Sequence, residues 1–436
     1  MRVPTALARS RFPAPVLQVL RTLSRAGFRS FLVGGAVRDP LLRRRRPSRD
    51  FDVATPARPE EVERLFPRVI PTGVEHGTVT VVARGIPVEI TTFRGEGPYR
   101  DGRRPESVTF LTNLESDLAR RDFTINALAY DPLGREFRDP FGGRKDMRLR
   151  RIRAVGNPEA RFAEDGLRPL RAVRFVAQLG FELAPSTRRA IPGSLNVVRR
   201  VAAERLTDEF SKLLVAPFAA LGLRLLRKTG LLGVVLPGLA SASGRALDHA
   251  IAVLAASPPV LSLRLSALFH GLSPAAAADA LAALRLSRQE SEAALSLVRA
   301  FPCRRLGQAA LPAPTPAAIR HWMARVDPQR TGALLSLAEA EVSAVPEARR
   351  AGAAAEVRRL KAGVRAVERR APPLSVRDLA LDGRAVAQEL GVGPGPRVGE
   401  ALRHLLDRVL ERPEENEPER LRAALREWSA TPPPRL

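Results

Sequence analysis

One short segment near the N-terminus constrains the fold of this chain more than any other. An apolar run leads into the dipeptide Gly34-Gly35, and the cation Arg38 follows three residues later. A second short strand is then expected to carry Asp50 and Asp52, with one residue between them. Because side chains alternate along a strand, these two carboxylates are expected to lie on the same face, a few ångströms apart.

Two carboxylates this close repel each other unless a cation lies between them. Mg²⁺ suits such a pair, because it typically takes one or two carboxylates and fills its other positions with water and substrate phosphates. Glycine lets backbone N–H groups approach an anion, and Arg38 adds positive charge. Taken singly, Asp-x-Asp is typical of a solvated strand end and Gly-Gly of an ordinary turn. Together they predict a site for a metal-bound nucleoside triphosphate, with Asp50 and Asp52 as catalytic metal ligands.

The chain has 436 residues, enough for about two to four domains, and it is strongly basic. Its 71 Lys and Arg residues outnumber its 46 Asp and Glu residues, for a formal net charge of +25. This excess favours a polyanionic partner, because arginines pair with phosphates and release counterions from nucleic acid. A GC-rich genome also favours arginine codons, and this explanation stays open for part of the excess.

Several protein classes are disfavoured by residue content and hydropathy. Cys303 is the one cysteine, so we expect neither an intramolecular disulfide nor a cysteine-based zinc site. The N-terminal segment has no continuous apolar core of a signal peptide, and no run of about 18 uncharged apolar residues is present. We therefore expect a cytoplasmic protein with no membrane span and no disulfide partner.

The pattern along the chain changes near residue 150. After a helix expected at 15–26, β-rich runs at 78–82 and 87–91 alternate with turns, and 94–105 is interpreted as a mobile basic loop. Beyond residue 150, helical patterns follow one another between Pro and Gly breaks. They cover residues 164–179, 203–214, 218–228, 259–269, 274–286 and 289–300. The chain is thus predicted to form a small α/β head and a long helical remainder.

A second group of polar residues lies outside the glycine and aspartate segment. Arg121 belongs to the run Arg-Arg-Asp-Phe-Thr-Ile-Asn-Ala at 120–127, and Asp165 precedes a basic helix. Arginines recur there at every third position: Arg168, Arg171 and Arg174. In a helix such residues share one broad side. Taken alone, a solvated face with an acidic helix cap is the favoured explanation.

Five short runs of the chain occur in the order typical of one enzyme family. They are Gly-Gly-Ala-Val-Arg-Asp at 34–39, Asp-Phe-Asp at 50–52, the run at 120–127, Glu-Asp-x-x-Arg at 164–168 and Arg-x-x-x-Glu at 205–209. In these motifs the chain resembles the class II tRNA nucleotidyltransferases, which comprise CCA-adding enzymes and bacterial poly(A) polymerases. The resemblance implies a polymerase-β-like α/β nucleotidyltransferase head followed by an all-α neck, body and tail.

The resemblance also implies a division of the chain and a set of roles. The implied parts are a catalytic head at 1–150, a nucleotide-selecting neck at 151–215, a body at 216–372 and a tRNA-binding tail at 373–436. Asp50 and Asp52 would hold Mg²⁺. The implied nucleotide-binding residues are Gly35, Arg38, Arg121, Asp165, Arg168, Arg171 and Arg174. The implied reaction adds CCA to the 3′ end of tRNA from CTP and ATP and releases pyrophosphate.

Base choice has a physical explanation in two of these residues. Cytosine and adenine both present an amine donor beside a ring-nitrogen acceptor. The carboxylate of Asp165 accepts from such an amine, and Arg168 donates to the ring nitrogen. Uracil and guanine present a carbonyl and a ring N–H instead, so both contacts would be mismatched.

Some alternatives stay open at this point. Relatives that add only A or only CC, and poly(A) polymerases, carry similar motifs; the basic loop at 94–105 favours full CCA addition. A helical RNA-binding protein without activity is disfavoured, because both aspartates are present.

His270-Gly271 occupies a position that reads His-Asp in some related chains. Without the Asp we expect no phosphohydrolase metal site, and His270 is interpreted as a helix-end residue.

Three further positions leave structural questions. Glu89 is either a third metal carboxylate or a strand-surface residue. Gly166 and Pro169 depart from the family pattern, which has helix formers or apolar residues there. If the helix begins near Arg168, Pro169 falls harmlessly in its first turn, and Asp165 then lies on a loop or cap.

Overall fold

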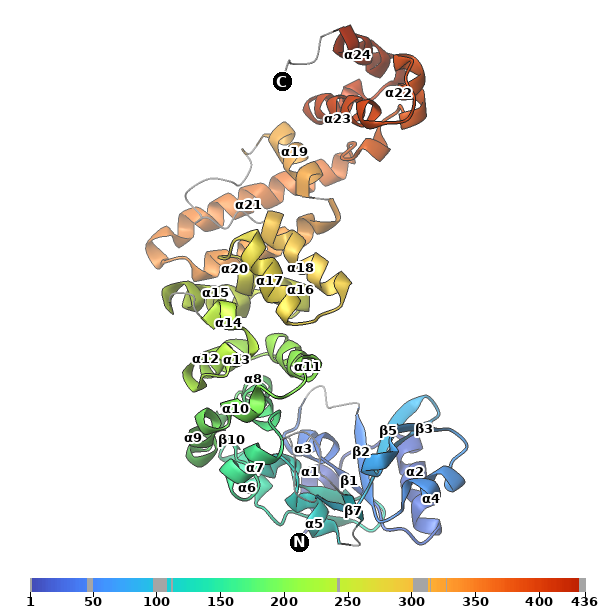
Figure 1. Cartoon of the computed structure of the whole chain (residues 1–436), viewed down its shortest axis with the longest axis vertical. Helices are drawn as coiled ribbons and strands as arrows, with labels where there is room; N and C mark the ends of the chain where they lie inside the picture. Colours follow the sequence, from blue (N-terminus) through green and yellow to red (C-terminus); the bar gives the residue numbers. More distant parts are fainter. Residues whose placement is uncertain are drawn as a thin grey trace. The chain divides into compact units, whose positions relative to one another are not determined.

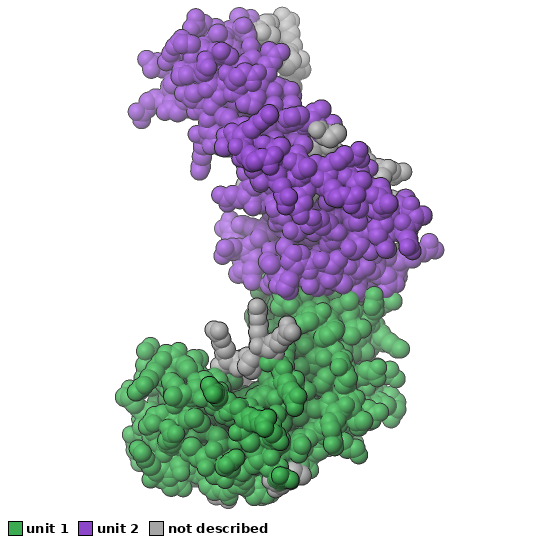
Figure 2. Space-filling view, turned by 180° about the vertical axis from the view of Figure 1, so that it is seen from behind, with its two compact units in different colours: residues 1–241, 283–286 green, residues 242–282, 287–436 purple. Residues whose placement is uncertain are grey.

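The computed structural model describes residues 2–44, 50–96, 108–110, 113–240, 244–300, 313, 315–326 and 328–430. The chain divides into two compact units, which Figure 2 shows in separate colours. The first unit comprises residues 1–241 and 283–286, and the second comprises 242–282 and 287–436. All predicted catalytic and nucleotide-binding residues belong to the first unit.

The first unit is built around a mixed sheet, some strands of which are labelled in Figure 1. In the described residues this sheet has seven strands, in the order β3-β4-β5-β2-β1-β8-β9. The strands are β1 (Phe31–Val33), β2 (Phe51–Thr55), β3 (Val69–Gly73), β4 (Thr78–Ala83), β5 (Ile86–Thr92), β8 (Ala129–Asp131) and β9 (Glu136–Arg138). Strand β2 lies in the middle, antiparallel to β1 and parallel to β5. The strands predicted at 78–82 and 87–91 are confirmed as β4 and β5.

Apolar side chains on and around the central strands form part of the core of the head. Phe31 and Val33 of β1 pack with Ala54 of β2 and Ala129 of β8 in one buried cluster. The predicted N-terminal helix is confirmed as α2 (Ala14–Arg25), whose buried residues face the core at helical spacing. This packing selects the register of the strands, because a shift by one residue would turn every side chain to the opposite face.

Helices make up most of the rest of the first unit. They include α3 (Gly35–Leu41), α5 (Leu114–Ala119), α6 (Gly143–Arg148), α7 (Pro158–Glu164), α8 (Arg168–Leu179), α9 (Pro185–Gly193), α11 (Ala203–Leu214) and α12 (Ala219–Thr229). Helix α8 packs against both α11 and α12. The helices predicted at 203–214 and 218–228 are confirmed.

The helix predicted at 164–179 was wrong at its N-terminal end. Helix α7 ends at Glu164, and α8 begins only at Arg168, with Pro169 in its first turn. Proline is tolerated there because the first-turn N–H groups have no partner within the helix. Gly166 lies in the connection, where an added Cβ would approach the carbonyl oxygen of Val197 to 2.6 Å. Close packing of the backbone therefore requires glycine at this position.

The second unit is helical throughout its described residues, as predicted. Its main helices are α15 (Gly244–Ala256), α16 (Leu261–Phe269), α17 (Pro274–Ala283), α18 (Arg288–Ala300), α19 (Pro316–Val326), α20 (Thr331–Ala344), α21 (Glu347–Arg370), α22 (Gly383–Leu390), α23 (Pro396–Glu411) and α24 (Pro418–Ala430). Among the described helices, none is long and apolar enough to span a bilayer. Cys303 and residues 97–105 of the predicted basic loop lie outside the described residues.

Candidate active site

Three carboxylates occupy adjoining positions on the central strands of the head. Asp52 of β2 is in register with Val33 of β1 on one side and with Glu89 of β5 on the other. Residues in register on neighbouring strands project from the same face, and Asp50 precedes Asp52 by two residues. The charge of Asp50 acts on both Asp52 and Glu89, in agreement with this common face.

Burial is the largest influence on the pKa of Asp52 and of Glu89. Burial raises the pKa of Asp52, and the neighbouring charge of Asp50 adds to this rise, although Arg121 opposes it. Burial also raises the pKa of Glu89, and the charge of Asp52 adds to the rise. Carboxylate oxygens are the ligands that hard divalent cations prefer. The residues present therefore fit a divalent metal ion, and Glu89, whose role the sequence left open, lies beside the predicted pair.

The glycine turn lies directly against this group. Gly34 has a φ of +62° and a ψ of −128°, a conformation that side-chain-bearing residues rarely adopt. An added Cβ would lie 3.2 Å from Oδ2 of Asp52 and 3.6 Å from Nη1 of Arg121. Gly35 then begins helix α3. The turn thus brings the backbone of Gly34, the Asp52 carboxylate and the Arg121 guanidinium close together.

Two of the predicted arginines are held in place by neighbouring polar groups. Arg38 is buried, donates to Asp39 and to Asn126 Oδ1 (2.8 Å), and lies over the ring of Phe175. Arg121 contacts the buried carboxylate of Asp117 at 3.4 Å. Fixed partners reduce the rotamer freedom of long side chains, so these two guanidinium groups are already oriented without a ligand.

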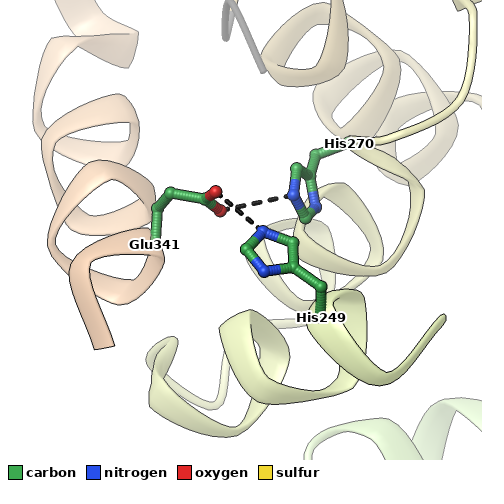
Figure 3. Close-up of side chains that lie close together, drawn as sticks. All are labelled: His249, His270 and Glu341. Atoms are coloured by element: carbon green, nitrogen blue, oxygen red, sulfur yellow. Dashed lines mark hydrogen bonds and ion pairs between the residues drawn. The ribbon is translucent and has the colours of Figure 1, made fainter. Parts of the chain in front are cut away.

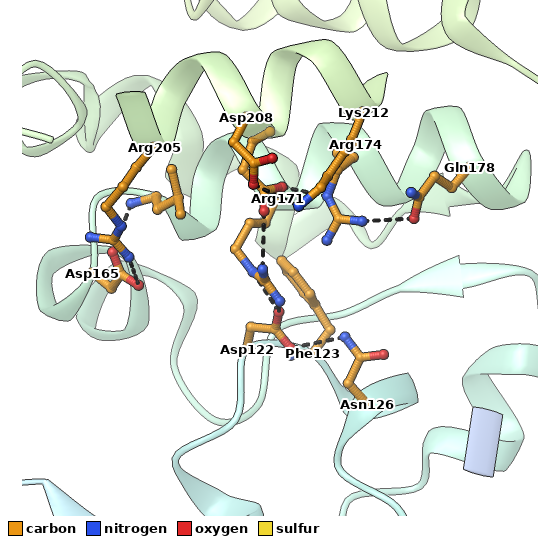
Figure 4. Close-up of polar contacts among 12 residues, drawn as sticks. Asp122, Phe123, Asn126, Asp165, Arg171, Arg174, Gln178, Arg205, Asp208 and Lys212 are labelled. Atoms are coloured by element: carbon orange, nitrogen blue, oxygen red, sulfur yellow. Dashed lines mark hydrogen bonds and ion pairs between the residues drawn. The ribbon is translucent and has the colours of Figure 1, made fainter. Parts of the chain in front are cut away.

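A network of buried charges connects the head to helix α8 (Figure 4). Asp122 accepts from Nε and Nη2 of Arg171 at 2.9 and 2.7 Å, and also from Asn126. Arg171 and Arg174 both donate to Glu209 of α11. Burial alone would raise the pKa of Asp122, but Arg171 and the hydrogen bonds lower it to about 2. The arginine helix is therefore fixed to the head by paired charges and is not a solvated face.

Asp165 lies at the C-terminal cap of α7, on the connection to α8. Its Oδ1 accepts from the backbone N–H of Leu167 at 3.0 Å, and Arg205 faces its Oδ2 at 3.6 Å (Figure 4). Arg168 is buried and donates to Glu164 and to the backbone carbonyls of Arg161 and Arg120. Asp165 thus occupies a cap, as expected if α8 begins at Arg168.

Sequence reasoning missed the partners that hold the site residues. These are Asp117, Asp122, Asn126, Arg205 and Glu209. Four of them belong to the runs at 120–127 and 205–209, so their motifs were visible. Their roles were not, because neither spacing nor periodicity tells which distant side chain each one meets.

Comparison with known proteins agrees with this arrangement. Residues 30–153 match the family model "Poly A polymerase head domain", and residues 180–243 match "Probable RNA and SrmB- binding site of polymerase A". The CCA-adding enzyme of Geobacillus thermodenitrificans is 40% identical over 418 residues, which is 95% of this chain and 97% of the relative. That of Geobacillus stearothermophilus is 53% identical over 224 residues, or 51% of this chain and 54% of the relative.

A solved structure extends the similarity to the fold. The crystal structure of the Bacillus stearothermophilus CCA-adding enzyme in complex with CTP is 35% identical, with a TM-score of 0.76. The match covers 96% of this chain and 98% of that one. Because sequence, order of motifs and fold agree over nearly the whole length, this chain belongs to the CCA-adding enzymes, a family of tRNA nucleotidyltransferases.

Proposed function

We propose that this chain adds C, C and A to the 3′ end of tRNA from CTP and ATP and releases pyrophosphate. The observation that carries the proposal is the group formed by Asp50, Asp52 and Glu89 beside the turn at Gly34. The 40% identical relative, which is matched over 97% of its length, is a CCA-adding enzyme, and the 35% identical solved structure contains CTP. Both support this reaction over other nucleotidyl transfers.

Membership of the family implies a divalent metal, and we assign it to Asp50 and Asp52 and identify it as Mg²⁺. Oxygen ligands and abundance in cells favour Mg²⁺ over softer metals. When bound, the cation supplies positive charge to the attacking and leaving oxygens of the transfer. Glu89 adds a third carboxylate at the neighbouring strand position and completes the negative charge around the cation.

The other groups of the head act on the triphosphate. The backbone at Gly34 and Gly35, with Arg38 and Arg121, binds and orients its oxygens, so that the tRNA 3′-hydroxyl faces the α-phosphorus. A P–O bond to the 3′ oxygen forms as the bond to pyrophosphate breaks. Catalysis of this kind depends mainly on positioning and on charge stabilisation. The fixed partners of Arg38 and Arg121 serve that positioning.

The nucleotide base is selected at the start of helix α8. Asp165 accepts from the exocyclic amine of cytosine or adenine, and Arg168 donates to the ring nitrogen beside it. Arg171 and Arg174, held by Asp122 and Glu209, complete the nucleotide contacts. Leaving a polar group unpaired in a closed site costs about 1–3 kcal/mol, which disfavours uracil and guanine.

The division of labour along the chain is proposed as follows: head 1–150, neck 151–215, body 216–372 and tail 373–436. The helices α22, α23 and α24 share a hydrophobic cluster of their own, which supports a separate tail. The excess of positive charge, +25 over the chain, supports tRNA binding by the helical parts. Since its substrates, tRNA and nucleoside triphosphates, are made in the cytoplasm, we assign the protein to that compartment.

The decisive experiment gives the purified chain a tRNA that lacks its 3′ CCA, with each nucleotide alone and with CTP and ATP together. We expect two C with CTP alone and a complete CCA end with both. Termination after two C in the presence of both nucleotides would indicate a CC-adding enzyme. Addition of A only to a tRNA that already ends in CC, or long A tails, would indicate the A-adding or poly(A)-adding alternatives.

Gly34→Ala is expected to reduce incorporation about 100-fold, because the added methyl group displaces the Asp52 carboxylate. Backbone strain lowers the free energy of unfolding by about 1–3 kcal/mol as well. Gly85→Ala is the matched control: its φ is +83°, but an added Cβ meets no described atom within 4 Å. The control should lose similar stability and keep full incorporation. Equal activity of the two variants would remove the turn from the proposed site.

Asp165→Ala is expected to relax base choice, lowering the preference for CTP over UTP about tenfold or more, while triphosphate affinity changes little. Single-turnover incorporation of each nucleotide measures the ratio. Glu159→Gln, an exposed carboxylate on the preceding helix α7, should keep wild-type selectivity. Unchanged selectivity in Asp165→Ala would mean that other groups read the base.

A further inference from the structure

Two histidines and a glutamate from three helices meet inside the second unit, far along the chain from the residues of the active site (Figure 3). His249 lies on α15, His270 caps α16, and Glu341 lies on α20. Nε2 of His249 is 2.7 Å from Oε1 of Glu341, and Nε2 of His270 is 3.3 Å from Oε2. His270 thus lies at a helix end, as predicted, but it also belongs to a cluster that the sequence did not indicate.

Both histidines also form hydrogen bonds with backbone groups. Nδ1 of His270 is 2.6 Å from the carbonyl oxygen of Ala267, which can only accept, so Nδ1 carries a proton. His249 makes a hydrogen bond with the backbone of Ala344, while its Nε2 lies against Glu341. In each neutral ring the remaining nitrogen, Nε2, then has a lone pair, and both lone pairs point towards the Glu341 carboxylate.

A lone pair that faces a carboxylate is unfavourable unless a proton or a metal ion lies between them. Protonating both rings would place two imidazolium ions in contact, with ring centroids 5.4 Å apart, where His270 and Glu341 are almost completely buried. One divalent cation replaces these two protons at the same total charge. It also ligates Oε2 of Glu341, which accepts no well-directed hydrogen bond from the described residues.

We propose that His249, His270 and Glu341 bind one divalent transition-metal ion of the zinc type, at a site separate from the catalytic carboxylates. Two imidazoles and one carboxylate are a ligand set that Zn²⁺ accepts, and all three ligand atoms lie within 4.8 Å of one another. The contact of His270 Nδ1 with the carbonyl oxygen of Ala267 orients that ring as outer-sphere partners do in known sites.

The role of this metal is structural. Its ligands come from α15, α16 and α20, which pack against one another, so a bound ion cross-links them. His249 is partly exposed, which leaves a route for the ion and a position for a water ligand. Gly271 provides no side-chain ligand, so the site differs from the His-Asp type that the sequence analysis considered.

The test uses the full chain with excess Mg²⁺, which occupies oxygen-ligand sites and competes poorly for imidazole. Titration with Co²⁺ should give a visible ligand-field band that saturates at one ion per chain, and Zn²⁺ should abolish it. Glu341→Gln and His270→Gln should each weaken Zn²⁺ affinity at least about 100-fold in a chelator competition. His321→Gln is the matched control, because His321 also contacts a glutamate, Glu411 at 2.9 Å, but does not belong to the proposed metal cluster. This variant should bind Zn²⁺ as the wild type does.

Thermal unfolding provides a second measurement, whose wild-type part does not depend on how well any variant folds. Zn²⁺ should raise the Tm of the wild-type chain and of His321→Gln, because a ligand that binds the folded state stabilises it. It should leave the Tm of Glu341→Gln, a substitution of nearly equal volume, unchanged. Absence of both the Co²⁺ band and the Tm rise in the wild type would overturn the proposal, as would a Co²⁺ band that persists in Glu341→Gln.

Discussion

Asp52→Ala is expected to lower nucleotide incorporation by about 1,000-fold or more, while tRNA affinity stays close to that of the wild type. Asp52 is in register with both the end of β1 and Glu89, so no other carboxylate can take its position in the group. Its removal deprives the cation of a ligand and the transfer of its charge stabilisation. We expect the affinity for tRNA to come from phosphate contacts with basic residues of the helical parts, which this substitution leaves intact.

Single-turnover kinetics measure nucleotide incorporation, and a binding titration at a fixed salt concentration measures tRNA affinity separately. Because burial opposes the charge of Asp52 and raises its pKa, its loss removes an unfavourable buried charge, and the Tm without metal should not fall. Glu136→Gln is the matched control: this carboxylate lies on β9 of the same sheet and pairs with Arg29 and Arg138 at the surface. It should keep full activity. Substantial incorporation by Asp52→Ala would remove this residue from the metal-binding role.

Asp122→Asn is expected to lower the free energy of unfolding by about 2 kcal/mol at pH 7 and to raise the KM for CTP. The pKa of Asp122 is about 2, against an ordinary value of 3.8, and each unit corresponds to about 1.4 kcal/mol. Its side chain is almost completely buried, so solvent screens the charge little. The KM rises because Arg171, a proposed nucleotide contact, loses the carboxylate that holds it.

The pH dependence of this difference has a defined sign. A carboxyl group whose folded-state pKa is depressed stabilises the fold fully above its ordinary pKa, and this stabilisation is lost as the pH falls towards the folded-state value. The difference in the free energy of unfolding between wild type and Asp122→Asn should therefore have its full value at pH 7 and disappear between about pH 4 and pH 2. Urea unfolding at a series of pH values measures it.

Asp208→Asn is the control for that experiment, because Asp208 forms an exposed pair with Lys212 on the helix that carries Glu209. Exposed pairs contribute about 0–1 kcal/mol, so little change is expected at any pH. If Asp122→Asn behaved like this control, the buried network would not be what fixes α8 to the head.

Local rules were sufficient for the parts of the fold that depend on neighbours in sequence. The alternation of side chains predicted that Asp50 and Asp52 share a face, and apolar periodicity predicted α2, α11 and α12. Proline chemistry also anticipated that α8 could begin at Arg168, although the pattern itself extended the helix to residue 164. These features depend on interactions within a few residues, which the sequence displays directly.

By itself, then, the sequence of this protein determined its family, the α/β head with a helical remainder, and the identity of the charged groups in its motifs. Only the tertiary structure decided which of these groups meet. Glu89 reaches Asp52 through strand register, Asp122 pairs with Arg171 across 49 residues, and His249 meets His270 and Glu341 from three helices. Such contacts depend on how separate elements pack, and no periodicity along the chain encodes the distance between them.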